Sequence, residues 1–599
     1  MVNERVAHYL KPAGQARIPR LHLCLNTEAL TAADGEYDRQ SWRLASGGWI
    51  VGHASRGLRH GDHCEYPTPL DLWADVNWRC RPGKRMIIWC HNLSYHLRIA
   101  NALQWLPSMG YKCEMIALSQ DAGWARFKGP NGTVLMTDLM SWCPVGLHGL
   151  YSDISAEGPE TTRALPDDRD AMSASVGKSN VIATTVMGIL RWVEGNDLGP
   201  WKATGPAQSH AAWRRKYLSD RVLVHDDLGA LAAEREAMWT GRAEAWRHGH
   251  IDRAPLYEYD MSLAYCQIGA DSTVPTVLLA QFGGGTDVSR YIDDGRTAVL
   301  SRVRVSASQP VVPCVYDGHI VWPVGTFDTV LWDAEICCAR LSGAEVSPYY
   351  SWVYSRAPAM GGICSYIAGG LNDAYGPTHP TIKRVLKHWA RTVIGRCALQ
   401  YDDWQPWGIS PEYDIRLSLV ADIDTGETVK QLQLGHDILE SKGKVESPES
   451  VPQIASWIMS ECRARLWHLM TIVGLDHVYY VDTDSLITDT VGNWRLDRAR
   501  QRNLLPPLHL KGVYHNVTIY GPRMLEVDGQ RRWAGIPLRA RRTDGGYYDD
   551  QMMSSLADSL QDRQHDSVRV MHRNFVPEPS DPRRIHLPDG HTLPIEVNA

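Results

Sequence analysis

Apolar residues follow two different periods along the chain, and these periods predict where strands and helices lie. Short apolar and β-branched runs predict strands at residues 21–25, 86–91, 256–259, 298–305, 319–324, 417–423 and 477–487. Helical spacing instead follows Pro380, where the buried face would consist of Ile382, Val385, Leu386, Trp389 and Val393. Because 599 residues are too many for one core, we expect an α/β (α+β) protein with several domains.

Two carboxylates interrupt the apolar run from His477 to Ile487. Asp482 and Asp484 stand on either side of Thr483, which predicts a β-hairpin with both acids at its tip. Carboxylate oxygens are hard ligands that suit Mg²⁺ or Mn²⁺. An ordinary Asx turn without a metal would have the same local sequence.

A second acid-bearing segment runs from Tyr257 to Tyr265. Its aromatic strand ends at Asp260, and small residues then lead into an apolar helix start. Such a strand-to-helix turn leaves backbone N–H groups unpaired, and these groups could hold a triphosphate. The alternative is that Asp260 only caps the helix.

The helix after Pro380 also carries a cationic stripe. Lys383, Lys387 and Arg391 are spaced by four residues, so they share a face that differs from the apolar one. Only 13 of the 62 basic residues are lysines, which makes two lysines one turn apart notable. Gly395, one turn further on, would let the backbone approach a ligand closely. A solvated surface stripe is the alternative.

These three segments, in this order, resemble the motifs of the family B DNA polymerases, above all the compact enzymes of phages and linear plasmids. Asp260 to Tyr265 looks like motif A, and Tyr480 to Ser485 matches motif C, Tyr-x-Asp-Thr-Asp-Ser, without a change. Lys387 to Gly395 is similar to motif B, Lys-x-x-x-Asn-Ser-x-Tyr-Gly. The residues that differ from the family pattern are Arg391, Thr392 and Ile394.

Two weaker similarities extend the resemblance. Trp239 to Arg242 looks like the Tyr-x-Gly-Gly/Ala element that guides the template, and Arg531 to Trp533 looks like the Lys-x-Tyr element near the primer end. The resemblance therefore implies a set of residues that contact DNA: Trp239, Gly241, Arg242, Tyr480, Thr483, Arg531 and Trp533.

The N-terminal part has the strands of the family's RNase H-like proofreading exonuclease, but its metal-binding acids are altered. Asn26 and Glu28 stand where the family has Asp-x-Glu. Asn92, Tyr95 and His96 stand where it has Asn-x-x-Tyr-Asp. Imidazole suits Zn²⁺ better than Mg²⁺. The third exonuclease motif stays unassigned, with Asp220, Asp226 and Asp227 as candidates. We expect an inactive exonuclease-like domain.

The resemblance implies a right-hand polymerase of palm, fingers and thumb after that domain. We expect the exonuclease-like domain at residues 1–230, the palm with a β-rich insertion at 231–375, and the fingers helix at 376–400. The palm would continue with motif C over 401–504, and the thumb and C-terminal tail would occupy 505–599. The tail from Val576, rich in Pro and Asp, is expected to lack regular structure.

Net charge and apolar patterning limit the binding partners and the cellular location that we expect for the protein. A net charge of −6 means that attraction to phosphate must come from local patches, such as the arginines between Arg531 and Arg542. The 13 cysteines form no Cys-x-x-Cys pair, so neither a zinc ribbon nor a disulfide framework is predicted. No stretch approaches the roughly 20 apolar residues of a membrane span. We expect a soluble protein of the bacterial cytoplasm, encoded by a phage or plasmid.

The function implied is template-directed DNA synthesis by two-metal nucleotidyl transfer, without proofreading. Asp260, Asp482 and Asp484 would hold two Mg²⁺ ions, or Mn²⁺. Lys387, helped by Lys383, would bind the β and γ phosphates, and Tyr265 would exclude a 2′ hydroxyl. Ser262 and Arg391 complete the expected nucleotide site. The partners would be primer-template DNA, deoxynucleoside triphosphates, and a terminal or accessory replication protein.

Two functions of other classes stay open. The polymerase site could be vestigial in a DNA-binding or structural protein, which the altered motif B favours and the intact carboxylates oppose. The chain could instead be a nuclease acting through its N-terminal domain, which the lost acids oppose. A reverse transcriptase would place two Asp side by side.

Overall fold

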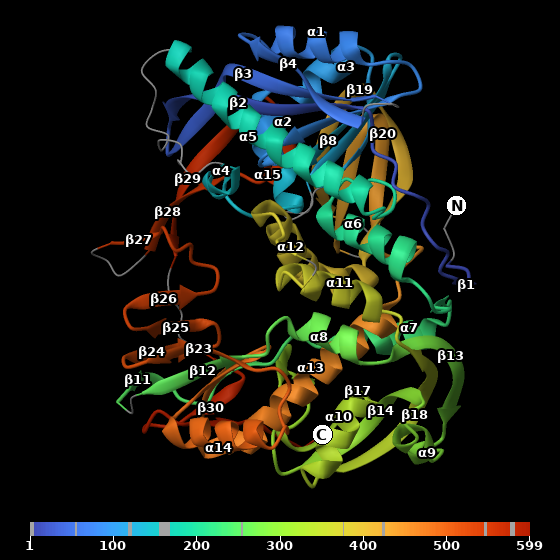
Figure 1. Ribbon diagram of the computed structural model, residues 1–599, viewed down its shortest axis with the longest axis vertical. Helices are drawn as coiled ribbons and strands as arrows, with labels where there is room; N and C mark the ends of the chain where they lie inside the picture. The colour runs from blue at the N-terminus through green and yellow to red at the C-terminus, as the bar shows by residue number, and fades with distance from the viewer. Residues whose placement is uncertain are drawn as a thin grey trace.

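Residues from distant parts of the sequence meet in three layers of the molecule (Figure 1). The computed structural model describes residues 5–53, 57–117, 123–154, 168–252, 255–374, 376–421, 426–543, 548–575 and 581–598. The N-terminal part lies at the top of Figure 1, helices α11 (Gly361–Leu371) and α12 (Pro380–Cys397) lie at mid-height, and two further sheets lie below them.

The N-terminal sheet is sandwiched between helices because its strands alternate apolar residues toward both faces. Leu23 and Leu25 face one core and Cys24 faces another, as the period of two requires. Helix α5 (Asp168–Gly195) packs on one face, whereas α1 (Pro69–Arg79), α2 (Leu93–Ile99) and α3 (Ala102–Ser108) contribute to the other core. Successive strands are β3 (Tyr37–His53), β2 (Leu21–Asp34), β5 (Arg85–Cys90), β8 (Gly132–Asp138), β7 (Trp124–Gly129) and β6 (Lys112–Ile116).

Strands from the far end of the chain extend this sheet. β29 (Ser567–Phe575) pairs with β3, and β28 (Tyr548–Met553) pairs with β29. Arg98 of α2 fixes the junction, because its buried guanidinium donates to the Ser554 carbonyl at 2.8 Å and to the Ser559 hydroxyl at 2.5 Å. The predicted thumb region is therefore partly built into the N-terminal sheet.

A five-stranded sheet, here called the central sheet, carries the predicted acids. Its order is β10 (Ala243–Ala245), β21 (Val478–Asp482), β22 (Ser485–Thr488), β12 (Leu256–Asp260) and β23 (His509–Tyr514). The strands predicted at 256–259 and 477–487 are confirmed, and the latter is a hairpin. β23 pairs with β12, so the segment just after the expected boundary at 505 is part of this sheet.

The β-rich insertion forms a second sheet with an unexpected edge. Its order is β13 (Val274–Gly283), β18 (Glu345–Ala357), β14 (Thr297–Ala307), β17 (Val324–Trp332) and β32 (Glu596–Asn598). The strand predicted at 298–305 is confirmed, whereas the run 319–324 is divided between β16 (His319–Val321) and β17. Because β32 pairs parallel with β17, the expectation that the tail lacks regular structure is wrong for residues 581–598. Residues 576–580 lie outside the described part.

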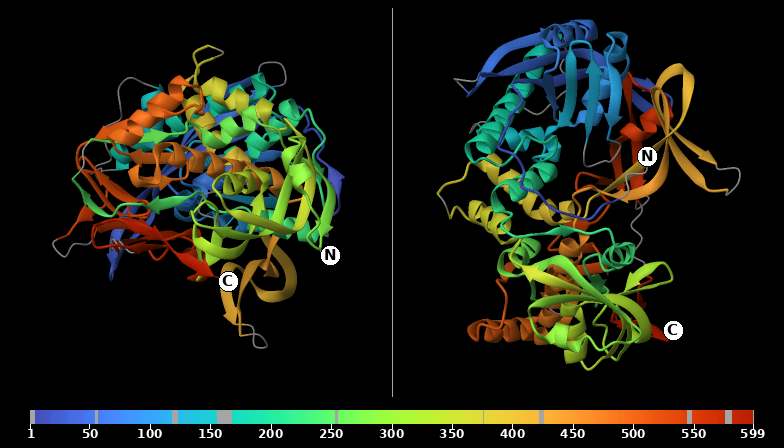
Figure 2. Two further views of the ribbon diagram at one scale, coloured as in Figure 1. Left: turned by 90° about the horizontal axis from the view of Figure 1, so that it is seen from below. Right: turned by 90° about the vertical axis from the view of Figure 1, so that its right-hand side faces the viewer.

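Helix α12 buries the face that its spacing predicts. Ile382, Val385, Leu386, Trp389 and Val393 are all buried, and α11 packs beside the helix. The chain then leaves as a long two-stranded ribbon, β19 (Gln400–Ala421) and β20 (Thr428–Glu446), which stands out beside the N-terminal sheet in Figure 2.

The ribbon packs on the N-terminal domain through four buried side chains, Ile415, Leu417, Leu432 and Leu434. Residues 400–421 and 426–446 thus lie outside the central sheet, within the range 401–504 that was predicted as palm. The end of the strand predicted at 417–423 falls outside the described residues. α13 (Pro452–Val473) then returns the chain to the hairpin with the acids.

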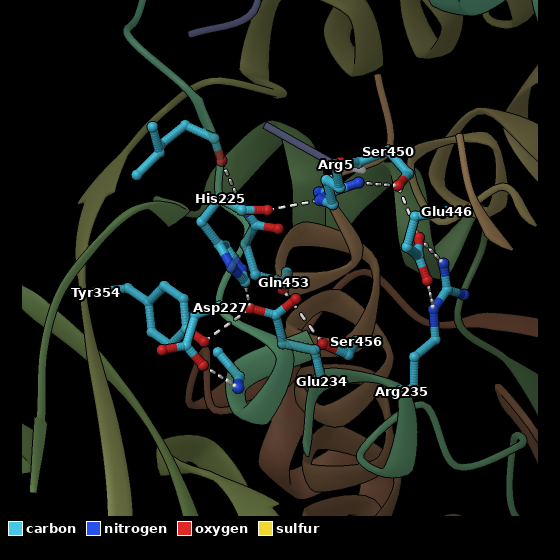
Figure 3. Close-up of polar contacts among 12 residues, drawn as sticks. Arg5, His225, Asp227, Glu234, Arg235, Tyr354, Glu446, Ser450, Gln453 and Ser456 are labelled. Atoms are coloured by element: carbon cyan, nitrogen blue, oxygen red, sulfur yellow. Dashed lines mark hydrogen bonds and ion pairs between the residues drawn. The ribbon is translucent and has the colours of Figure 1, made fainter. Parts of the chain in front are cut away.

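A polar junction ties the ribbon, α13 and the N-terminal segment together (Figure 3). Arg235 of α7 (Leu228–Glu236) pairs with Glu446 through both carboxylate oxygens at 2.5 and 2.7 Å. Arg5 donates to the Ser450 hydroxyl at 2.9 Å. Beside them, the buried Glu234 carboxylate faces His225 Nε2 at 2.8 Å and accepts from the Tyr354 hydroxyl at 2.7 Å. These contacts fix the angle at which the ribbon leaves the body.

Among the described helices, we find none whose length and apolar character would let it cross a bilayer.

Candidate active site

The acid-bearing hairpin has a strained tip. Thr483 adopts a φ of +60°, which is rare for a β-branched residue. Its N–H donates to the Arg242 carbonyl at 2.7 Å, and its hydroxyl donates to Asp482 Oδ1 at 3.1 Å. The Asp484 N–H donates to the Asp482 carbonyl at 2.7 Å. The turn therefore presents both carboxylates from a backbone that its neighbours hold in place.

Gly241 packs against this tip so closely that no side chain fits between them. A methyl group at Gly241 would lie 2.4 Å from Thr483 Oγ1 and 2.8 Å from Thr483 Cβ. The residue was predicted to contact DNA. In the structure it packs against the acid-bearing hairpin, so the Trp239–Arg242 element and motif C form one packed unit.

Asp260 joins the other two acids through strand pairing. β12 lies beside β22 with Asp260 opposite Ser485, and the Met261 N–H donates to the Asp484 carbonyl at 2.8 Å. The ends of β12 and β21 therefore bring Asp260, Asp482 and Asp484 to the same edge of the central sheet, as expected for a shared metal site.

Two cations that the sequence analysis missed lie against these acids. Lys511 Nζ on β23 is 3.8 Å from Asp260 Oδ1 and 3.3 Å from Glu258 Oε1. Arg523 Nε is 3.5 Å from Asp482 Oδ1. Lys511 could have been noticed, because it is the last lysine of the chain and lies within an apolar run. Arg523 has no comparable signal in the sequence.

The electrostatics of the edge fit a divalent cation. Burial, followed by the nearby charges of Asp260 and Asp482, raises the pKa of Asp484 from 3.8 to about 6, although Lys511 opposes the shift. Within the described residues, no three potential ligands already converge in a metal-binding arrangement. The acids are instead partly balanced by Lys511 and Arg523. Hard oxygens that disfavour one another's charge form a donor set that Mg²⁺ or Mn²⁺ would stabilise.

The predicted nucleotide residues differ in how available they are. Lys387 and Arg391 are exposed on α12, whereas Lys383 is already paired with Asp373. Tyr265 lies on α8 (Ala264–Asp271), and burial raises the pKa of its hydroxyl. Ser262 is exposed in the turn before this helix, whose first residues have no side-chain cap. The backbone N–H groups of this first turn therefore receive no side-chain cap from Leu263.

Three residues predicted to touch DNA have buried side chains. Trp239 donates its indole N–H to the Val330 carbonyl at 3.0 Å. The Tyr480 hydroxyl accepts from the Arg523 N–H at 2.8 Å. The Arg242 guanidinium is only 1% exposed and donates to Glu244 at 2.6 Å. Each of these side chains is engaged within the protein, and the predicted contacts with DNA remain predictions.

Arg531 and Trp533 lie on β26 (Gln530–Trp533) and remain partly accessible. Arg531 donates to the Pro537 carbonyl at 2.8 Å, and its guanidinium lies 4.1 Å from the Tyr548 ring centroid. The Trp533 ring packs edge-on against Tyr520 and Tyr548. Between them, Arg532 donates to Glu258 at 2.7 Å, which links this strand to the acid edge.

The exonuclease-like positions form a closed hydrogen-bonded cluster. The Asn26 amide donates to Glu28 at 2.9 Å and to the Ser175 hydroxyl at 3.0 Å. Lys178 of α5 pairs with Glu28 at 2.8 Å. An ammonium group therefore occupies the charge-balancing role that a metal would have beside this acid.

His96 is engaged at both ring nitrogens. Its Nε2 donates to the His91 carbonyl at 2.9 Å, and its Nδ1 accepts from the Thr27 N–H and hydroxyl at 3.2 and 2.8 Å. Burial lowers the pKa of His96 to about 3, so the ring is neutral at pH 7. With both nitrogens used, His96 has no lone pair left for Zn²⁺.

Asn92 begins α2 and caps it by accepting from the Tyr95 N–H, and Tyr95 itself is largely buried. None of the candidates for the third exonuclease motif lies in this cluster. Asp227 caps α7, Asp226 accepts from the Ala7 N–H, and the half-buried Asp220 accepts from the Ser219 hydroxyl. The helix that contacts Asn26 and Glu28 is α5, through Ser175 and Lys178.

The raised pKa of Asp484 predicts a pH-dependent cost of folding. The contribution of Asp484 to the free energy of unfolding is complete below about pH 4 and is lost as the pH rises through about 6. At the higher pH the carboxyl is ionised in the unfolded chain, whereas the folded protein disfavours its ionisation. Asp484→Asn should therefore stabilise the metal-free protein at pH 7 by on the order of 2 kcal/mol. Thermal melts from pH 7 to pH 4 should show this gain shrinking. Exposed Asp497→Asn is the control, and an equal or lower melting temperature for Asp484→Asn at pH 7 would contradict the assignment.

Comparisons with known proteins show which fold the structure has. No family model and no curated protein sequence matches the chain. The structure is similar to Phi29 DNA polymerase complexed with primer-template DNA and incoming nucleotide, with a TM-score of 0.66 and 12% identity, covering 94% of this chain and 100% of that one. An orthorhombic crystal form of the same polymerase gives 0.63, 12%, 93% and 100%. At this identity the match establishes the fold: an exonuclease-type domain followed by a palm, fingers and thumb, as the sequence predicted.

Proposed function

We propose that this protein is a DNA polymerase that extends a primer 3′ hydroxyl under the direction of a DNA template. The observation that carries the proposal is the meeting of Asp260, Asp482 and Asp484 at one edge of the central sheet. The similarity to a polymerase whose structures contain primer-template DNA, single-stranded DNA and incoming nucleotides supports it. Its place of action would be the bacterial cytoplasm, on phage or plasmid DNA.

The acids would act by binding metal ions, which place positive charge beside the reacting oxygens. Asp260 and Asp484, assisted by Asp482, would hold two Mg²⁺ ions. When bound, such ions lower the pKa of the primer hydroxyl and neutralise the attacking and leaving oxygens. Lys511 and Arg523 balance the same acids in their absence, which keeps the edge assembled before substrates arrive.

Other side chains would position the nucleotide. Lys387 and Arg391 are exposed on α12 and would bind the triphosphate, whereas Lys383 would have to leave Asp373 first. The open turn at Ser262 offers backbone N–H groups to the phosphates. Tyr265 follows this turn and would lie beneath the sugar, where its ring would exclude a 2′ hydroxyl.

Two observations bear on the alternatives. A vestigial site would have no reason to keep three acids at one edge with compensating cations, so we do not favour a purely structural role. A nuclease would need metal ligands in the N-terminal cluster, where Lys178 and His96 now close the site. We therefore propose that the polymerase lacks proofreading.

The carboxylate assignment predicts the effect of removing one charge. Asp260→Asn and Asp484→Asn should each slow primer extension by about a thousandfold or more, because each removes a charged metal ligand. DNA affinity should change little. Asp328→Asn, an exposed acid of the inserted sheet, is the matched control. Extension at the wild-type rate by either active-site variant would refute the two-metal site.

The position of Tyr265 predicts sugar discrimination. Tyr265→Ala should raise ribonucleotide incorporation relative to deoxynucleotide by about tenfold or more, because the cavity left by the ring admits the 2′ hydroxyl. Tyr265→Phe keeps the ring and should keep the wild-type ratio. Competition assays measure both. If the ratio for Tyr265→Ala stays unchanged, the tyrosine only packs the core.

The closed N-terminal cluster predicts that a mispaired 3′ end persists. A labelled primer with a terminal mismatch, incubated in Mg²⁺ without nucleotides, should keep its length with the wild-type protein. The Asp260→Asn variant runs beside it, because that change leaves the N-terminal cluster intact. Stepwise shortening by both proteins would show that an active exonuclease site exists after all.

A further inference from the structure

The last residues of the chain fasten onto the back of the central sheet. Residues 581–598, here called the C-terminal clasp, include the hairpin of β30 (Arg584–His586) and β31 (Thr592–Pro594). The Thr592 hydroxyl donates to the Ala245 carbonyl at 2.7 Å, and the His248 N–H donates to the Gly590 carbonyl at 2.7 Å. The same segment ends as β32 on the inserted sheet. The clasp thus connects two sheets at the edge where β10 lies.

A buried charge triad anchors the clasp. Arg584 is fully buried and donates to Glu244 Oε1 at 2.9 Å, while Arg242 donates to Glu244 Oε2 at 2.6 Å. Arg584 also donates to the Thr592 hydroxyl at 2.8 Å. Both arginines oppose the effect of burial on Glu244 and keep its pKa below the ordinary value. Glu244 is therefore ionised and shared between the clasp and the loop before β10.

The triad connects to the metal-binding hairpin through backbone contacts. The carbonyl of Arg242 accepts the Thr483 N–H at 2.7 Å, and β10 pairs with β21 so that Ala243 lies opposite Asp482. The Arg242 side chain is enclosed by Trp322, Trp467 and Trp246, with ring centroids 5.2 to 5.8 Å from the guanidinium carbon. If Glu244 lost its partner Arg584, the position of Arg242 would change. The Arg242 carbonyl, which holds the strained tip, would move with it.

We propose that Arg584 is a positioning residue for the active site: it fixes Glu244, which fixes Arg242, whose carbonyl holds Thr483 between the two acids of the hairpin. The consequence for DNA synthesis rests on the proposed function, whereas the consequence for the hairpin does not. On this view the C-terminal clasp completes the polymerase site, although Arg584 lies far from Arg242 and Thr483 in the sequence.

Loss of one partner from a buried triad leaves an uncompensated charge, so stability must be separated from positioning. Arg584→Met removes the charge, and Arg584→Lys keeps it but offers a single donor group in place of the fork that reaches both Glu244 and Thr592. Arg304→Ala, which breaks an exposed pair with Asp328 on the inserted sheet, is the control. Thermal melts first identify a temperature at which every variant is folded, and the comparisons are made at that temperature.

Hydrogen exchange of the peptide spanning residues 480–487 tests the proposal without any substrate. We expect exchange of the hairpin tip to be at least tenfold faster in Arg584→Met, intermediate in Arg584→Lys, and unchanged in Arg304→Ala. If Arg584→Met does not fold, the Arg584→Lys comparison decides. A lower melting temperature with unchanged exchange at the tip would show that Arg584 is merely structural and would overturn the proposal.

Primer extension adds a second readout. The Mg²⁺ concentration for half-maximal extension should rise about tenfold in Arg584→Met and less in Arg584→Lys, because a loosened tip no longer presents Asp482 and Asp484 together. An unchanged Mg²⁺ dependence would count against positioning. If the wild-type protein itself extends no primer, the proposed function fails, and the exchange comparison still decides the role of Arg584.

Discussion

Backbone hydrogen bonds to neighbouring segments hold Asp484 and Thr483, and with them the acid-bearing edge of the central sheet. Three carboxylates at one edge repel one another, so their own interactions cannot assemble the site. Backbone donors do so instead: Met261 N–H to the Asp484 carbonyl, and Thr483 N–H to the Arg242 carbonyl. The packing of Gly241 on Thr483 leaves the tip no room to move. Lys511 and Arg523 then offset part of the repulsion.

The N-terminal domain meets the same electrostatic problem in another way. There the cluster has lost its extra acids, and Glu28, Asn26 and Lys178 satisfy one another without an ion. His96 is held neutral by burial and by hydrogen bonds at both nitrogens. A cluster with one acid and one ammonium is stable without metal, whereas an edge with three acids gains from it. The similarity to the solved polymerase structures therefore concerns the fold. Within this chain, a few side chains set the different chemistry of the two clusters.

Local patterns predicted much of this, and long-range pairing accounts for what they missed. The strands at 21–25 and 256–259, the hairpin at 477–487 and the buried face of α12 follow from residue periodicity alone. β23 pairs with β12, β29 with β3, and β32 with β17. These pairs join segments that lie hundreds of residues apart in the sequence, and no local signal specifies them. For the same reason the sequence could not show that Trp239, Arg242 and Tyr480 are buried. The motifs singled out these residues in the sequence but did not reveal their burial.

Primer extension by the wild-type protein tests the central claim most directly. A labelled primer on a template of defined sequence is incubated with Mg²⁺ and either all four deoxynucleotides or single ones. The account predicts full-length product with all four, and with single nucleotides a product that grows only where the template calls for the base supplied. No extension under any of these conditions, or addition that ignores the template, would contradict the assignment of the acid edge as a polymerase active site.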